Sequence, residues 1–257
     1  MNLFLIKKTF FDMWDNMLTV FLLNIGFVLV VGGALYLPIV LNFSVFFSYF
    51  GVAIGIVLFF LYSGAASLVA RNMVDYQTTG FREFVAYFKE TWKQSLLLAG
   101  ITIVQAFIIL VAFPFYMSMG GILGVAAMSL IFWVSVIWWI ASQYYYPIRA
   151  RLDESLRKIV RKSFVVFFDN TVFSLVIAIG TIATFIVSGF TAFLLPGITT
   201  ILIWHQAALK LRLLKYDYLE ENPEADRKKI PWDALLIDER ERVGHRTLRG
   251  MIFPWKE

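Results

Sequence analysis

The fold is decided by the stretch NMLTVFLLNIGFVLVVGGALYLPIVLNFSVFFSYFGVAIGIVLFFLYSGAASLVA, residues 16–70, because it contains no Asp, Glu, Lys or Arg. Two further charge-free stretches follow at residues 94–148 and 170–209. One helical membrane span needs about 20 apolar residues. Each stretch is therefore long enough for two helices and a turn. This predicts an all-α membrane protein with six transmembrane helices in three helical hairpins.

The composition agrees with a membrane protein and excludes several kinds of site. Hydrophobic residues make up 60% of the 257-residue chain, against roughly 45–50% in soluble domains. The apolar runs are continuous rather than alternating, which argues against a β-barrel. The chain has no cysteine, so disulfides, thiolate nucleophiles and cysteine metal sites are excluded. The two histidines show no ligand spacing, and we expect no metal and no cofactor.

The positive charges occur in four segments that flank the charge-free stretches. Short loops next to membrane spans carry Lys and Arg on the cytoplasmic side. All four segments, and with them both termini, are therefore expected in the cytoplasm. The six spans are expected at residues 17–37, 47–70, 95–113 (ending at Pro114), 122–145, from Thr171, and up to about Leu209.

The third charge-free stretch is the shortest of the three. Forty residues barely hold two spans, and the turn could fall at Ser188-Gly189 or at Pro196-Gly197. A single span followed by a half-inserted helix is the alternative. The charge rule favours two spans, because one span would place Lys210 outside.

The three hairpins also read as an internal repeat over about residues 5–75, 79–152 and 157–215, followed by a cytoplasmic tail at 216–257. Each unit would begin with a cytoplasmic amphipathic helix. Aligned without gaps, the units share an aromatic pair at i, i+4, which lies on one helix face, and then a polar break that suits a helix N-cap. Such parallel units could pack with pseudo-threefold symmetry. The aromatic pairs are Phe10–Trp14, Phe84–Phe88 and Phe164–Phe168.

The tail is too apolar to remain free in water. It could dock on this protein's own cytoplasmic face, on the bilayer or on a partner. The candidate partner-binding residues are Trp232, Leu236, Ile252, Phe253 and Trp255.

No catalytic constellation is visible, and within the spans His205 is the one ionisable residue. Buried ionisable groups in membranes often mark a functional path. Ser63, Gln143 and Gln206 lie at similar depths and could converge on one central axis, and His205 could contact a proton or a substrate. These four are the candidate substrate-binding residues. The alternative is that they form ordinary hydrogen bonds between helices.

A basic amphipathic segment follows the second hairpin. It carries Arg149, Arg151, Arg157, Lys158, Arg161 and Lys162. Attraction to anionic lipids explains it, and a partner-docking face is the other interpretation. No aromatic platform for nucleic acid accompanies it.

The chain resembles the YesL-like family of bacterial membrane proteins. The resemblance covers about residues 1–215 and is carried by the aromatic helix before the first span, Leu37-Pro38, residues 81–93 and residues 145–155 (YYPIRARLDES). It implies the bacterial plasma (inner) membrane and an accessory role beside a carbohydrate ABC importer, with no functional residues to carry over.

The leading hypothesis is therefore a non-enzymatic accessory membrane protein that binds a membrane partner, by resemblance a permease of an ABC transporter. The alternative is a small pseudo-threefold transporter or channel. An intramembrane enzyme is the weakest reading, because the spans contain no set of acid, base and nucleophile.

Overall fold

The computed structural model describes residues 1–227, 229–244 and 246. Helices make up 84% of the structure, and the described residues form no β-strand. The helices are α1 (Asn2–Asp15), α2 (Met17–Val40), α3 (Val45–Val74), α4 (Phe81–Phe107), the π-helical turn η1 (Ile108–Ala112), α5 (Phe113–Met119), α6 (Gly121–Ser142), α7 (Tyr145–Arg151), α8 (Leu156–Asp169), α9 (Thr171–Phe190), α10 (Gly197–Glu221), α11 (Trp232–Leu235) and α12 (Ile237–Val243).

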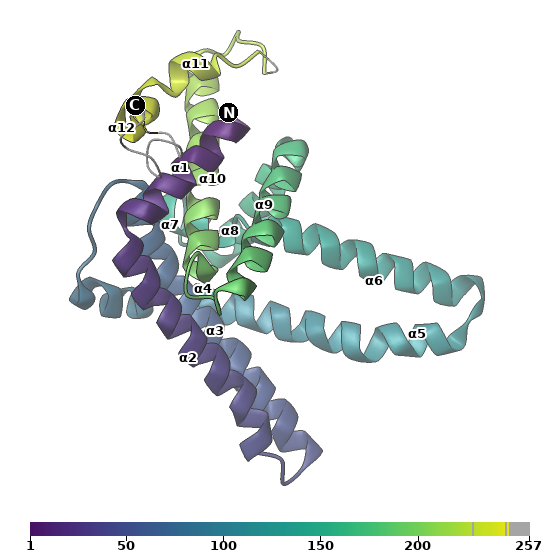
Figure 1. Cartoon of the computed structure of the whole chain (residues 1–257). Coiled ribbons are helices and arrows are strands. Elements are labelled where there is room, and N and C mark those ends of the chain that lie inside the picture. Colours follow the sequence, from purple (N-terminus) through teal and green to yellow (C-terminus); the bar gives the residue numbers. More distant parts are fainter. Residues whose placement is uncertain (228, 245, 247–257) are drawn as a thin grey trace.

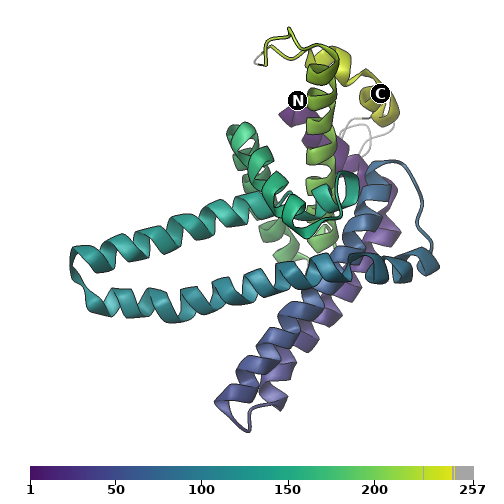
Figure 2. The same ribbon diagram turned by 180° about the vertical axis from the view of Figure 1, so that it is seen from behind.

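The helices pair as three hairpins that leave a common bundle in different directions (Figure 1). α2 packs on α3, the α4–η1–α5 segment returns as α6, and α9 packs on α10. The α2–α3 hairpin and the α5–α6 hairpin extend away from each other, and the view from behind shows the same divergence (Figure 2). Their outer parts therefore pack mainly within their own hairpin.

Five helical segments are long and apolar enough to cross a membrane, which indicates a multi-pass membrane protein. They are Met17–Val40, Val45–Val74, Phe81–Met119, Gly121–Arg151 and Thr171–Phe190. Helix α10 is not among them. Residues 197–209 precede its first charge and span only about 20 Å at 1.5 Å per residue, against a hydrocarbon core of about 30 Å.

From the sequence we expected the third span to end at Pro114, but it does not. The helix continues through it to Met119. A proline ring inside a helix clashes with the carbonyl four residues earlier. The π-helical turn Ile108–Ala112 lies immediately before it, and its wider backbone relieves this conflict.

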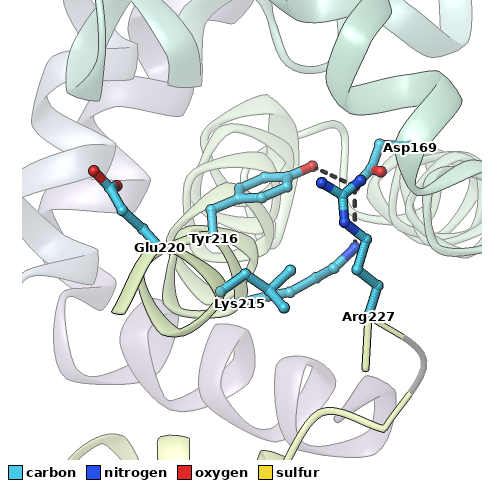
Figure 3. Close-up of a pocket in the computed structure, with 6 residues that line it drawn as sticks. Asp169, Lys215, Tyr216, Glu220 and Arg227 are labelled. Carbon is cyan, nitrogen blue, oxygen red and sulfur yellow. Dashed lines mark hydrogen bonds and ion pairs between the residues drawn. The ribbon is translucent and has the colours of Figure 1, made fainter. Parts of the chain in front are cut away.

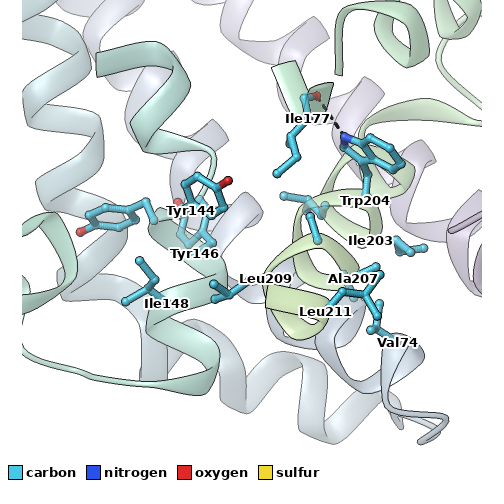
Figure 4. Close-up of a cluster of buried hydrophobic side chains, with 14 of the residues drawn as sticks. Val74, Tyr144, Tyr146, Ile148, Ile177, Ile203, Trp204, Ala207, Leu209 and Leu211 are labelled. Carbon is cyan, nitrogen blue, oxygen red and sulfur yellow. Dashed lines mark hydrogen bonds between the residues drawn. The ribbon is translucent and has the colours of Figure 1, made fainter. Parts of the chain in front are cut away.

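Three consecutive tyrosines at the start of α7 connect the hairpins. Tyr144, Tyr145 and Tyr146 are 1%, 0% and 7% exposed. The Tyr144 hydroxyl lies 2.7 Å from that of Ser174 in α9, the Tyr145 hydroxyl donates to the Gln94 carbonyl in α4, and the Tyr146 hydroxyl donates to the Phe60 carbonyl in α3. Burying an aromatic ring with its hydroxyl bonded is favourable. Because the three hydroxyl partners belong to three different hairpins, α7 is where the hairpins meet. Figure 4 shows Tyr144 and Tyr146 in the same buried cluster as Ile177 of α9.

The turn of the third hairpin packs against the middle of α2. The amide of Asn24, fully buried in α2, donates to the carbonyls of Leu194 and Pro196 at 2.9 and 2.8 Å. Its oxygen accepts from the Thr199 N–H at 2.9 Å, in the first turn of α10. Gly197 has φ +69°, and a Cβ there would collide with this amide. Since Val40 lies sixteen residues beyond Asn24, the third hairpin stops about 24 Å short of the end of α2.

The polar breaks are present in the first and third units but not in the second. Asn16 separates α1 from α2 and Asn170 separates α8 from α9, whereas α4 runs through Glu90 without a break. The expected N-caps are wrong at both asparagines. Their amides donate backwards, to the Asp12 carbonyl at 2.8 Å and the Val166 carbonyl at 3.1 Å. The last carbonyls of a helix lack a full set of partners within the helix, and an amide can supply a donor. The Val166 carbonyl also accepts from the Asn170 backbone N–H at 3.1 Å.

The aromatic pairs of all three units are in contact. Ring centroids are 6.1 Å apart in the first unit, 5.2 Å in the second and 6.5 Å in the third. The pairs in the first and third units are stacked, while the pair in the second is edge-on. With only two breaks and two stacked pairs, the threefold repeat and its symmetry stay a prediction.

Candidate functional site at the charged end of the bundle

Lys8 of α1 is the centre of a buried ionic network, and its side chain is fully buried. Its ammonium lies 3.1 Å from Asp12 Oδ2 and 3.0 Å from Glu239 Oε2. It also donates to the Val74 carbonyl at 3.2 Å and to the Tyr76 hydroxyl at 2.9 Å. A buried charge is tolerated only when it is paired and hydrogen-bonded, and Lys8 meets both conditions.

Lys210 and Arg151 extend the network from α10 and α7. The Lys210 ammonium lies 3.1 Å from Asp75 Oδ1 and 2.6 Å from Glu239 Oε1. The Arg151 guanidinium holds both oxygens of Asp75, at 2.9 Å to Oδ2 and 3.2 Å to Oδ1. Such two-pronged arginine–carboxylate pairs are among the strongest polar contacts in proteins.

The network joins all four charged segments of the sequence. Lys8 comes from the first, Asp75 from the second, Arg151 from the third, and Lys210 and Glu239 from the last. Its three cations balance the carboxylates of Asp12, Asp75 and Glu239. We call these six residues the charged junction. It fixes α1, the end of α3, α7, α10 and the tail helix α12 on one side of the structure.

The carboxyl groups of the charged junction have opposite pKa shifts. Burial raises the pKa of Asp12 to about 7, and the charge of Lys8 offsets this only in part. Burial also acts on Asp75 and Glu239, but there the neighbouring cations outweigh it. Arg151 and Lys210 hold the pKa of Asp75 below its usual range, and Lys8 and Lys210 do the same for Glu239. Asp12 is therefore the proton acceptor of the junction near neutral pH.

Asp12→Asn is expected to change how stability depends on pH. The folded-state pKa of Asp12 lies above its ordinary value of 3.8, so the folded protein holds the proton more tightly. The contribution of Asp12 is then largest below pH 3.8 and declines as the pH rises toward 7. Between pH 5 and 8 we expect the wild-type melting temperature to fall by several degrees relative to the variant. Parallel pH curves for the two proteins in detergent would contradict this assignment.

The four candidate substrate-binding residues do not share one site. Gln143 and His205 are brought together through Thr181, whose hydroxyl lies 3.2 Å from Gln143 Oε1 and 2.9 Å from His205 Nε2. Ser63 donates to the Phe59 carbonyl of its own helix at 2.7 Å. These contacts do not support a common axis for the four side chains.

Gln206 points in another direction, toward the charged junction. Its amide donates to the Ser67 hydroxyl at 2.9 Å, and its oxygen accepts from Arg151 Nε at 3.2 Å. It thus supports the arginine that holds Asp75. The Gln143 amide nitrogen, by contrast, is buried with no hydrogen-bond partner among the described residues.

A second polar site lies where α8 meets the far end of α10. It is a cavity of about 270 Å³. Asp169 Oδ2 accepts from Lys215 Nζ at 3.0 Å and from Tyr216 Oη at 2.9 Å (Figure 3). It also accepts from Asn170 Nδ2 at 3.2 Å. These donors are already used within the chain, so the site holds α8 to α10. The lining residues are Asp169, Lys215, Tyr216, Leu219, Glu220 and Arg227.

The described part of the tail docks on its own chain. Leu236 is fully buried, and Trp232 is half-buried with its ring 5.3 Å from the Arg212 guanidinium. A partner could reach Leu236 only after the tail had separated. Helix α10 runs through the domain boundary expected at residue 215 and ends at Glu221. The other predicted partner-binding residues, Ile252, Phe253 and Trp255, lie outside the described residues.

Reasoning from sequence missed the charged junction, although part of its signal was present. Lys8 and Asp12 are spaced i, i+4, which places them together on a helix face. That spacing marks many solvent-exposed pairs as well. Lys8 contacts Val74 and Glu239, and Lys210 contacts Asp75, over more than 60 positions of sequence, which no local pattern reveals.

Comparisons of the chain with models of protein families, with curated proteins and with solved structures found no match. The resemblance to the YesL-like family therefore stays a prediction.

Proposed function

We propose that this chain is a non-enzymatic accessory protein that binds a second membrane protein through the exposed face of α6. By the resemblance, the partner is the membrane subunit of a carbohydrate ABC importer in the bacterial plasma membrane. Helix α6 belongs to the hairpin α5–α6, which extends away from the rest of the bundle (Figure 1).

One face of α6 has the composition of a helix–helix interface. Ile122, Ala126, Ser129 and Trp133 are spaced by four, three and four residues and so share a face. All four are exposed, Ile122 by 86% and Trp133 by 61%. In lipid, helices associate through small residues that allow close approach and through hydroxyls that bond across the contact. Ala126 and Ser129 supply both, beside the large Trp133.

Ser129 is the single observation that carries the proposal. Its hydroxyl is exposed on an apolar span and forms no hydrogen bond with any described residue, whereas Ser63 and Ser174 bond carbonyls of their own helices. An unpaired hydroxyl in a hydrocarbon surrounding is unfavourable. A partner helix supplies the missing acceptor.

We further propose that the charged junction and both termini lie in the cytoplasm. The junction supports this, since it joins the four charged segments, and short basic segments face the cytoplasm. The third hairpin then enters and leaves on the same side, with its turn held inside the membrane by Asn24. Irregular backbone at that depth is tolerated only where protein buries it.

Bulky residues on the α6 face are expected to prevent partner binding. We would purify Ala126→Leu/Ser129→Leu from the native host in mild detergent and identify whatever comes with it. The wild type is expected to recover a membrane protein in stoichiometric amount, and the variant to lose at least about 90% of it, because two interface positions are worth more than about 1.4 kcal/mol together.

Val134→Leu is the matched control, because Val134 is exposed on another side of the same helix. It should retain the partner. Equal recovery from all three proteins, or recovery of this chain alone as a defined oligomer, would refute the proposed interface.

A further inference from the structure

A single exposed stripe runs along α8 and changes from basic to apolar along its length. It consists of Arg157, Arg161, Val165 and Phe168, spaced by four, four and three residues. Val165 and Phe168 are 56% and 63% exposed, and both arginines are exposed as well. The opposite face of α8 is buried through Ile159, Ser163, Val166 and Phe167. The stripe is thus the outer surface of α8.

The two arginines are available for a ligand. Neither forms a hydrogen bond or ion pair within the described residues. The neighbouring Lys158 and Lys162 are already partly neutralised, because their ammonium groups lie 3.6 and 3.5 Å from Asp153 Oδ2. Arg157 and Arg161 are therefore two unneutralised cations, one helical turn apart, beside apolar side chains.

We propose that Arg157 and Arg161 bind the phosphate groups of anionic phospholipids. In a bilayer, the charged headgroup lies next to the acyl region, which is the order of the stripe. A guanidinium suits a phosphate because its planar N–H groups can make two parallel hydrogen bonds. Val165 and Phe168 then contact the acyl chains and set the depth of the helix.

Helix α4 shows the same order and supports this placement. Its exposed residues Lys89 and Lys93 are followed, on the same face, by Leu96 and Val104, which are 38% and 59% exposed. However, Glu90 lies beside Lys89 and pairs with Arg149, so the local charge on α4 is lower. Helix α8 is therefore the stronger of the two sites. The inference does not depend on the proposed partner.

The test compares melting temperatures of the detergent-purified protein during titration with phosphatidylglycerol. We expect this lipid to raise the wild-type melting temperature more than phosphatidylcholine does. For Arg157→Gln/Arg161→Gln we expect about a 30-fold loss of apparent affinity for phosphatidylglycerol. Each cation near an anionic surface contributes about 1 kcal/mol, and about 2 kcal/mol corresponds to this factor. Both side chains are exposed and unpaired in the described structure, so the variant should fold with an unchanged melting temperature before lipid is added.

Arg82→Gln/Lys229→Gln is the matched control, since it removes two exposed charges that lie outside α8. It should respond to phosphatidylglycerol like the wild type. An equal loss of response in both double variants would overturn the proposal, because general attraction to charge would explain it. Equal stabilisation by inorganic phosphate, or an unchanged response of Arg157→Gln/Arg161→Gln, would also overturn it.

Discussion

Asn24→Leu is expected to lower the free energy of unfolding by about 2 kcal/mol or more, because it leaves two backbone groups unsatisfied at about 1 kcal/mol each or above. These groups are the carbonyl of Leu194 and the N–H of Thr199, whereas the Pro196 carbonyl still accepts from the Thr200 hydroxyl at 2.6 Å. No water is present at this depth in a membrane to replace the amide. The measurement is thermal unfolding in detergent, together with the fraction of protein that elutes as a single species.

Asn42→Leu is the control for this prediction. Asn42 is exposed in the turn between α2 and α3, and its replacement should change the melting temperature little. If Asn24→Leu melts at the same temperature as Asn42→Leu, the turn of the third hairpin does not depend on α2. The claim that Asn24 holds this turn would then be wrong.

Lys8→Met is expected to lower the free energy of unfolding by about 3–5 kcal/mol, since its removal leaves buried carboxylates without their cation. Glu239 would then keep Lys210 and the Tyr76 hydroxyl, while Asp12 would lose its ion pair. Adding Asp12→Leu to Lys8→Met should recover part of this loss, because an apolar pair avoids the unpaired charge. The melting temperatures of the single and double variants decide between these outcomes.

Lys158→Met provides the reference for a surface ion pair, which is worth roughly 0–1 kcal/mol. Its side chain is 66% exposed and lies 3.6 Å from Asp153. If Lys8→Met were no more harmful than Lys158→Met, the charged junction would not hold α1 to the tail. A double variant less stable than Lys8→Met would argue that Asp12 is stabilised by other groups.

The positions of the spans could be predicted because they depend on one local property, the absence of charge over a length of chain. Residues 17–37 and 47–70 agree with α2 and α3 to within a few residues. The sixth span could not be judged in the same way. Its apolar length is short, and whether a short helix is buried depends on contacts such as that between Asn24 and Thr199, which join distant parts of the chain.

The polar residues were harder to assign than the apolar ones. The breaks at Asn16 and Asn170 were predicted correctly. Which helix end their side-chain amides satisfy could not be predicted, because an amide can donate and accept equally well. Ser63, Gln143 and Gln206 lie at similar depths, yet depth does not determine the direction of a side chain around its helix. Gln206 turns toward Arg151 and Ser67, and Gln143 toward Thr181.

The tyrosines of α7 show the same limit. From the sequence, the fourth span was expected to end at Tyr145, with no role assigned to the three tyrosines. Their burial between three hairpins follows from their hydroxyl partners Ser174, Gln94 and Phe60. Because those partners belong to three different hairpins, the role of α7 becomes visible only when the hairpins are assembled.

The most direct test of the proposed function is photo-crosslinking from position 129 in native membranes. A photoreactive amino acid replaces Ser129, and the adducts are separated by mass and identified. The account predicts one dominant adduct with another membrane protein, and no such adduct from position 134 on the other side of α6. Adducts only with lipid, or only with a second copy of this chain, would contradict it.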